Sequence, residues 1–416
     1  MKHSAVPLAS VVLALLLGAG APRAQYYGPA DTEKPFLQDM ILFPEEPHAW
    51  YRIPSIVVAR SGVVLAFAER RIGTNHDWGH DSESVVRRSF DHGKTWGPIQ
   101  TIVSIKHLDP DSGPVVVDYT TGRIFRFFKW VSSAARSPAF DTEQPEEMKR
   151  LGYGAYEIHS DDDGATWSQP RKVPLSHPLA KSRLNIGNGI HGIQLRDGRL
   201  VVEGGWMAEP IWHSGGRYMR ACFVVSDDHG ETWRVAGHYI PSQADLARTE
   251  TSPGGAQTEY SMLELNDGSI YVNSRAARNA IGKDSDHPWR TILWSKDRGE
   301  TMEGWRYEKS QISGTHAGLA RYDKDRILIS FATRPGREQM SVMMSMDEGK
   351  SWPVSKIAWD GPGGYSDLAV AKDKSILMLY EKSKLGAPPR GGNVPGGENE
   401  FMALARFNLS WLTQSR

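Results

Sequence analysis

Short apolar segments with strand-forming side chains recur along the chain, and each leads directly into the same polar turn. Cys222–Val225, Thr291–Trp294 and Val342–Met344 are three such segments. In the turn, an aspartate can accept backbone N–H bonds, a glycine supplies a positive φ, and Thr-Trp begins a new strand. The sequence therefore predicts five β-hairpin turns of the form Ser-x-Asp-x-Gly-x-Thr-Trp, at 89–96, 160–167, 226–233, 295–302 (with Met302 in place of the tryptophan) and 345–352.

The spacing of these turns predicts the architecture. Their first serines, at 89, 160, 226, 295 and 345, are 71, 66, 69 and 50 residues apart. A repeat at a near-constant period indicates stacked or radially arranged units. Units of roughly 62 residues, counted from about residue 45, give six four-stranded blades, a number within the range of β-propellers. We therefore predict an all-β, six-bladed β-propeller in which one blade lacks the turn, with the turns on the outer rim.

The termini and the composition complete the domain prediction. The apolar run after the first residues predicts a signal peptide over 1–24, cut after Ala21 or Ala24. Residues 25–416 are expected to form a single propeller domain. The only cysteine is Cys222 and the net charge is zero, so neither a disulfide nor broad attraction to nucleic acid or membranes is expected. We expect a short helix at 145–151, a loop at 386–398, and a last strand at 401–409 that completes the blade begun by 36–43.

Three arginines are candidates for binding an anion. Arg52 stands before Pro54, which should hold Ile53 extended and start a strand at Ser55. Arg275 ends a predicted strand and Arg337 precedes another. Three such arginines at equivalent strand ends of different blades can converge on the propeller axis and bind one carboxylate, although each could equally be a solvated surface residue.

The turns resemble the Asp boxes of sialidases (neuraminidases), which also occur in propellers that are not enzymes. The ordered motifs of nearly the whole chain resemble this family more specifically. The matching segments are YRIP at 51–54, TEYS at 258–261 followed by NSR at 273–275, RE at 337–338, GPGGYSDL at 361–368, LYE at 379–381 and the glycine-rich GIHG at 189–192.

The resemblance implies roles for the site residues. Tyr365 would be the nucleophile, the tyrosine exception among glycosidases, and Glu259 its base. Arg52, Arg275 and Arg337 would bind the sugar carboxylate, and Glu381 would orient Arg52. The family's acid/base aspartate matches Asp77 best, with Asp81 as the alternative, and Arg71 or Arg70 would contact the carboxylate or this aspartate. No cofactor or metal is expected. His76 and His80, together with two aspartates of the same loop, could imitate a metal site, but no further cluster of ligand residues supports one.

The sequence thus predicts a secreted or periplasmic, retaining exo-α-sialidase that hydrolyses terminal sialic acids of glycoconjugates through a tyrosyl-enzyme intermediate. A trans-sialidase, or a hydrolase of a related nonulosonic acid, has the same sequence features. A non-catalytic carbohydrate-binding propeller would be expected to lack part of the set of arginines, tyrosine and glutamate. The expected partner is a sialylated glycoconjugate, with no nucleic acid and no membrane insertion after signal removal. The oligomeric state is open, with a monomer expected.

Overall fold

The structure, a computed structural model, describes residues 34–73, 75, 81–104, 108–132, 154–175, 184–186, 189–207, 219–237, 259–275, 289–333, 337–385 and 401–414. The expected signal peptide at 1–24, the helix at 145–151, the loop at 386–398 and Asp77 lie outside these residues. Within the described part, no helix has both the length and the apolar character that crossing a membrane requires.

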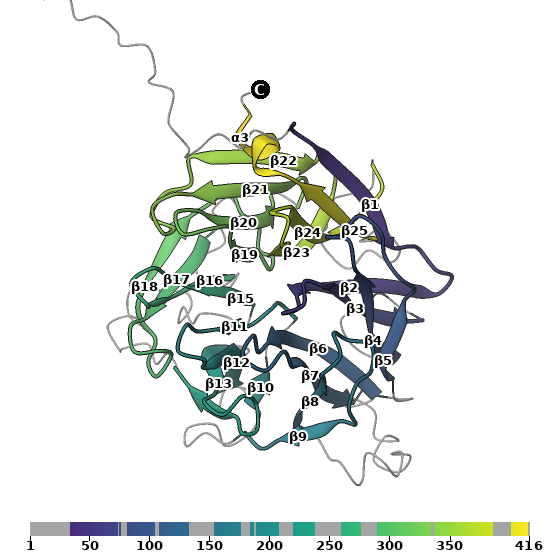
Figure 1. The fold of residues 1–416 in the computed structure, drawn as a ribbon, viewed down its shortest axis with the longest axis vertical. Coiled ribbons are helices and arrows are strands. Elements are labelled where there is room, and N and C mark those ends of the chain that lie inside the picture. Colours follow the sequence, from purple (N-terminus) through teal and green to yellow (C-terminus); the bar gives the residue numbers. More distant parts are fainter. Residues whose placement is uncertain are drawn as a thin grey trace, which may run out of the picture.

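Six antiparallel sheets surround a common axis, as the repeat spacing predicts (Figure 1). Their innermost strands contact one another around the centre. The first three blades are β2 (Ala49–Val58), β3 (Val64–Ile72), β4 (Asp81–Ser89) and β5 (Gln100–Ser104); β6 (Leu108–Val117), β7 (Ile124–Ser132), β8 (Gly154–Ser160) and β9 (Arg171–Val173); and β10 (Leu184–Ile186), β11 (Ile193–Gln194), β12 (Leu200–Met207), β13 (Met219–Ser226) and β14 (Arg234–Ala236).

The second half of the chain forms three more blades and closes the ring. These are β15 (Tyr260–Glu264), β16 (Ile270–Arg275), β17 (Trp289–Ser295) and β18 (Glu303–Lys309); β19 (Gly318–Arg321), β20 (Ile327–Ala332), β21 (Met340–Ser345) and β22 (Val354–Trp359); and β23 (Gly363–Val370), β24 (Ile376–Lys382), β25 (Phe401–Phe407) and β1 (Leu37–Phe43).

The last blade joins the two ends of the described chain. β1 pairs antiparallel with β25, so the expected closure is correct, and this blade lacks an Asp box. The last strand ends at Phe407, earlier than predicted, because Asn408 caps a short helix, α3 (Leu409–Thr413), by accepting the Trp411 N–H at 3.0 Å. Leu409 and Leu412 of α3 are buried in the core cluster between the last two blades.

The hydrophobic core lies between the blades. Six apolar clusters each combine side chains of two neighbouring sheets. Because a blade is covered on both faces, its middle strands are buried on both sides and do not alternate between buried apolar and exposed polar residues. All six residues of β20, Ile327–Ala332, are buried.

The five Asp boxes connect the third and outermost strands of their blades. In the first box, Ser89 Oγ accepts the Gly93 N–H at 2.9 Å and Asp91 Oδ1 accepts the Thr95 N–H at 2.8 Å. The sequence predicted a positive φ only at the glycine, but the residue before it is also left-handed in every box, with φ between 55° and 63° at His92, Asp163, His229, Arg298 and Glu348. Two successive left-handed residues turn each box onto the preceding blade.

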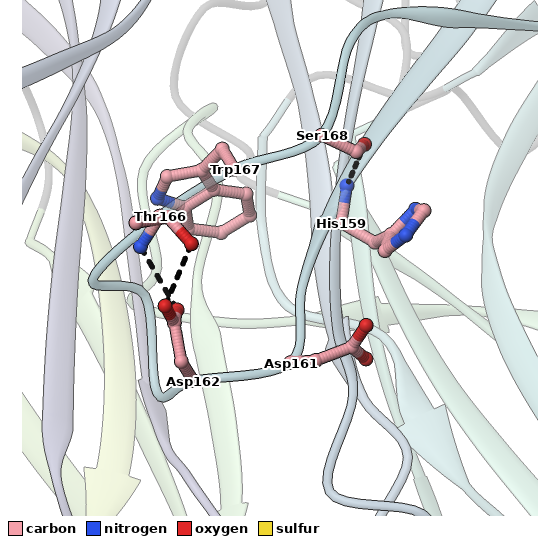
Figure 2. A pocket seen from close by; sticks show the side chains of 6 residues that line it. All are labelled: His159, Asp161, Asp162, Thr166, Trp167 and Ser168. Carbon is pink, nitrogen blue, oxygen red and sulfur yellow. Dashed lines mark hydrogen bonds between the residues drawn. The ribbon is translucent and has the colours of Figure 1, made fainter.

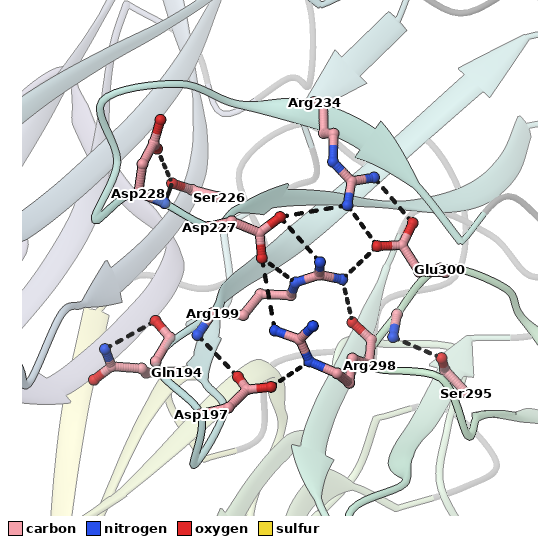
Figure 3. A network of polar contacts seen from close by, with 12 residues as sticks. Gln194, Asp197, Arg199, Ser226, Asp227, Asp228, Arg234, Ser295, Arg298 and Glu300 are labelled. Carbon is pink, nitrogen blue, oxygen red and sulfur yellow. Dashed lines mark hydrogen bonds and ion pairs between the residues drawn. The ribbon is translucent and has the colours of Figure 1, made fainter.

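Polar contacts at the rim reinforce this packing. His229 Nδ1 lies 2.9 Å from Asp118 Oδ2 of the preceding blade. Between the third and fourth blades, Arg199 joins Asp227 and Glu300, each at 2.7 Å (Figure 3). Arg234 and Arg298 add further ion pairs to this network. The boxes and their neighbours are therefore structural links between blades.

Replacing Trp233 with alanine should lower the free energy of unfolding by about 3–5 kcal/mol, the usual loss for a large buried aromatic. Its indole packs edge-on against Phe125 and Phe127, with centroids 5.6 and 4.9 Å away. Trp233→Met should lose less, because Met302 is buried at the same box position of the next blade. Denaturant unfolding measures both variants, and equal losses would contradict the packing role.

Candidate active site

Three arginines from different blades surround Tyr365. Arg275 lies at the end of β16 and its Nη1 donates to Tyr365 Oη at 2.9 Å. The guanidinium carbons of Arg52, in β2, and Arg337, ahead of β21, lie 5.9 and 5.4 Å from the centroid of the tyrosine ring. Tyr365 itself lies near the start of β23. The fold therefore brings together four residues that are far apart in the sequence.

Glu381, on β24, links the arginines to the tyrosine. It is completely buried and its Oε1 accepts from Arg52 Nε at 2.6 Å and from the Ile53 N–H at 3.1 Å. Its Oε2 accepts from the Tyr365 N–H at 3.0 Å. One carboxylate thus holds both the side chain of Arg52 and the backbone of Tyr365 in place.

The backbone at Ile53 differs from the expectation. Ile53 is not extended but left-handed, with φ 57°, and Arg52 lies inside β2 rather than ahead of it. The register between β2 and β3 shifts between Arg52 and Ser55, which marks a β-bulge. A left-handed conformation is unfavourable for a β-branched residue. The bond from the Ile53 N–H to Glu381 helps to hold it.

Close packing on the other side of Ile53 involves the glycine-rich segment. A Cβ on Gly189 would lie 2.1 Å from Ile53 Cγ2, so only glycine fits there. In the same segment, His191 Nδ1 lies 2.8 Å from Asp367 Oδ1. The Ile56 N–H donates to Asp367 Oδ2 at 2.9 Å, so these contacts join β2, β23 and this segment.

Glu259, Arg275 and Tyr365 form one hydrogen-bonded unit. Arg275 Nη1 donates to Glu259 Oε2 at 2.5 Å as well as to the tyrosine hydroxyl. Burial alone would raise the pKa of Glu259, but the charges of Arg275 and His316, together with interactions with Arg275 and the Tyr365 hydroxyl, lower it to about 2. Burial, followed by the negative charge of Glu259, raises the pKa of the Tyr365 hydroxyl well above its usual value. At neutral pH the pair is therefore a carboxylate beside a neutral phenol.

Of the two adjacent arginines at the end of β3, Arg71 is the buried one. Its Nε donates to Glu69 Oε1 at 2.6 Å and its Nη1 donates to Asn75 O at 3.2 Å. Arg70 instead pairs with Glu46 and Glu83 and is about one third exposed. Asp81 begins β4 opposite Ile72. Asp77 lies outside the described residues, so its role and that of Asp81 stay predictions.

Several buried polar residues near the site were not found by the sequence reasoning. Arg290 donates from Nη1 to Thr315 O at 2.7 Å and from Nε to Asn273 Oδ1 at 2.6 Å. His316 packs edge-on against Tyr365, with ring centroids 5.2 Å apart. The only signal available was a charged residue inside an apolar strand, as with Glu203 in Leu200–Met207. That pattern does not show which residue faces the site.

Two other features of the described residues do not indicate a second site. No group of three or more His, Cys, Asp or Glu side chains among them could hold a metal ion. A small pocket lies in the second blade, beside its Asp box (Figure 2). Its lining residues are His159, Asp161, Asp162, Thr166, Trp167 and Ser168, none of which was predicted as a site residue.

The fold and the site define a six-bladed propeller of the Asp-box type, with a site lined by arginines from three blades. The profile of the BNR repeat-like domain family matches residues 54–378. A sialidase of Micromonospora viridifaciens is 30% identical over 411 residues, which cover 95% of this chain and 56% of that protein. An exo-alpha-sialidase of Aspergillus fumigatus is 26% identical, with 87% of this chain and 84% of the other covered.

Solved structures show the same architecture. The Hadza microbial sialidase Hz136 superposes with a TM-score of 0.66 at 23% identity, covering 88% of this chain and 66% of that one. The intramolecular trans-sialidase from Ruminococcus gnavus superposes with a TM-score of 0.65 at 18% identity, covering 88% and 96%. The chain belongs to the sialidase family of BNR-repeat propellers. It spans 56% of the length of the Micromonospora viridifaciens protein.

Proposed function

We propose that this protein is an exo-α-sialidase that removes terminal sialic acid from glycoconjugates with retention of anomeric configuration. The observation that carries the proposal is the convergence of Arg52, Arg275 and Arg337 on Tyr365, whose hydroxyl accepts from Arg275 and whose pKa is raised by the charge of Glu259. Membership of the sialidase family and the names of the relatives support it.

The chemistry of sialic acid explains why these residue types suit it. The sugar carries a carboxylate on its anomeric carbon, and guanidinium groups bind a carboxylate through paired hydrogen bonds. A carboxylate nucleophile would be repelled by the charge of the substrate, whereas the neutral phenol of Tyr365 is not. Since a phenol is a poor nucleophile near neutral pH, a base must accept its proton during attack.

In the proposed first step, Tyr365 Oη bonds to the anomeric carbon and the bond from that carbon to the leaving oxygen breaks. Glu259 accepts the phenolic proton, and Asp77, assigned through the resemblance, protonates the leaving group. Substrate binding would draw Arg275 towards the sugar carboxylate and away from Glu259. The pKa of Glu259, held at about 2 chiefly by Arg275 against the effect of burial, would then rise as the proton arrives.

In the second step, water attacks the anomeric carbon, Asp77 accepts a proton from the water, and the bond to Tyr365 breaks. The tyrosine recovers its proton from Glu259, and the sugar leaves with the configuration that it had in the substrate. If a sugar hydroxyl replaced the water, the same site would perform a trans-sialidase reaction.

The proposal predicts that purified protein releases the aglycone of an aryl α-sialoside and that the first sugar product seen by NMR is the α-anomer. Transfer to added lactose would indicate a trans-sialidase. First appearance of the β-anomer would overturn retention. No turnover, combined with binding of the sialoside, would indicate a carbohydrate-binding propeller.

A further inference from the structure

A short segment ahead of β19, Ser313–Ala317, packs against the residues that hold the substrate site. Thr315 O accepts from Arg290 at 2.7 Å, and Ala317 O accepts from Ser261 Oγ at 2.5 Å. Gly314 O accepts from Arg337 Nη2 at 3.3 Å, and a Cβ on Gly314 would lie 3.7 Å from Arg275 Nε. The segment therefore contacts Arg337 and lies close to Arg275, two of the three arginines around Tyr365.

His316 is the one residue of this segment whose ring meets the tyrosine. It is 2% exposed, and its ring stands edge-on to that of Tyr365 with centroids 5.2 Å apart and planes at 66°. Its Nε2 lies 3.6 Å from Oε2 of Glu203, a completely buried residue of β12. Glu203 of the third blade thus faces His316, which precedes the fifth blade, and the ring of His316 contacts Tyr365 of the sixth blade.

The charges around His316 come from several elements. Glu203 faces it from β12, Glu259 from ahead of β15, and Asp367 from β23; Arg275 and Arg290 face it from β16 and β17. Burial, opposed by Glu259, lowers the pKa of His316 from 6.5 to about 4. The imidazole is therefore neutral near pH 7 and gains its proton only as the pH falls towards 4. The positive charge of protonated His316 is one of the causes that lower the pKa of Glu259, so protonation of the ring weakens Glu259 as a base.

We propose that His316 is a positioning residue for Tyr365 and that Glu203 holds its ring in place, an assignment that rests on the proposed function. The Glu203 carboxylate favours the tautomer with the proton on Nε2. The fixed ring limits rotation of the Tyr365 side chain, so that the hydroxyl stays between Glu259 and the anomeric carbon. The neutral ring leaves Glu259 as the acceptor of the phenolic proton.

The test uses His316→Gln, which keeps an N–H donor towards Glu203 and removes the ring, and His316→Phe, which keeps the ring and removes the donor. Glu203→Gln probes the carboxylate. His159→Gln is the matched control, because His159 is also a histidine that faces a buried glutamate. Its Nδ1 lies 3.9 Å from Glu157 Oε1, and it lines the small pocket in the second blade (Figure 2). We expect kcat on an α-sialoside to fall about 10–100-fold in His316→Gln, since small displacements of reacting groups have effects of this size.

KM should change less than about threefold, because the arginines still bind the carboxylate. His316→Phe and Glu203→Gln should show smaller losses of kcat, and His159→Gln none. If His316→Phe and Glu203→Gln fail to fold, His316→Gln still decides the outcome. Unchanged kcat in His316→Gln, or a rise in KM alone, would overturn the proposal.

The pH profile provides a readout that a purely structural role would not change. Protonation of His316 should reduce wild-type kcat/KM as the pH falls towards 4, whereas His316→Gln cannot gain that proton. The ratio of variant to wild-type kcat/KM should therefore rise as the pH is lowered, and a ratio independent of pH would contradict the positioning role. Failure of the proposed function is recognised separately, because the wild-type protein would then release no sialic acid.

Discussion

Replacing Tyr365 with phenylalanine should abolish turnover and leave the binding of sialic acid nearly unchanged. The substitution removes only the hydroxyl, which accepts from Arg275 and interacts with the charge of Glu259, and it keeps the aromatic ring beside Arg52 and Arg337. We expect kcat to fall by at least about a thousandfold, as for other residues that form the covalent intermediate. Steady-state kinetics with an aryl α-sialoside and calorimetric titration with sialic acid measure the two effects.

Glu259→Gln should lose much of the same rate, and the double variant should lose little more, because the two residues act as one unit. Tyr380→Phe is the matched control. It is a buried tyrosine of β24 in the same blade, and its hydroxyl donates to Asp39 Oδ1 at 2.8 Å. A substrate with fluorine beside the anomeric carbon should leave a covalent adduct on Tyr365. Mass spectrometry that maps the adduct to another residue would refute the mechanism.

The architecture was predictable because it repeats. Five Asp boxes at similar spacing are enough to predict the ring of six blades and the blade without a box, since each box closes one outer hairpin. The local backbone was less predictable. Ile53 is left-handed although Pro54 favours an extended residue, because a β-bulge and contacts with Glu381 and Gly189 determine its conformation. These contacts come from distant parts of the chain.

The candidate site was likewise only partly predictable from the sequence. Motifs near Arg52, Arg275, Arg337 and Tyr365 identified these residues individually, but only the arrangement of the six blades around the axis brings them together. Glu203 and His316 lie outside those motifs, and their relation to Tyr365 depends on the packing of three blades. A sequence pattern records the periodicity of single strands, whereas contacts across the axis depend on how the blades are arranged.

Replacing Glu381 with glutamine should both destabilise the protein and weaken substrate binding. Glu381 is completely buried and accepts from Arg52 Nε, the Ile53 N–H and the Tyr365 N–H. Glutamine has one acceptor oxygen for these donors and lacks the negative charge that pairs with the buried guanidinium of Arg52. We expect the free energy of unfolding to fall by about 3–5 kcal/mol, the usual effect of removing one partner of a buried ion pair. Denaturant unfolding measures this loss.

The control is Glu348→Gln, at a partly exposed ion pair on the rim, where Arg321 lies 2.9 Å away. Its loss should be no more than about 1 kcal/mol, since solvent screens such pairs. The double variant Arg52→Met/Glu381→Met removes both buried charges and should recover part of the stability, because an apolar pair can replace a buried ion pair. Its KM for an α-sialoside should nevertheless stay raised, because Arg52 is missing from the carboxylate site. Recovery of both stability and KM in the double variant would show that Arg52 does not bind the substrate.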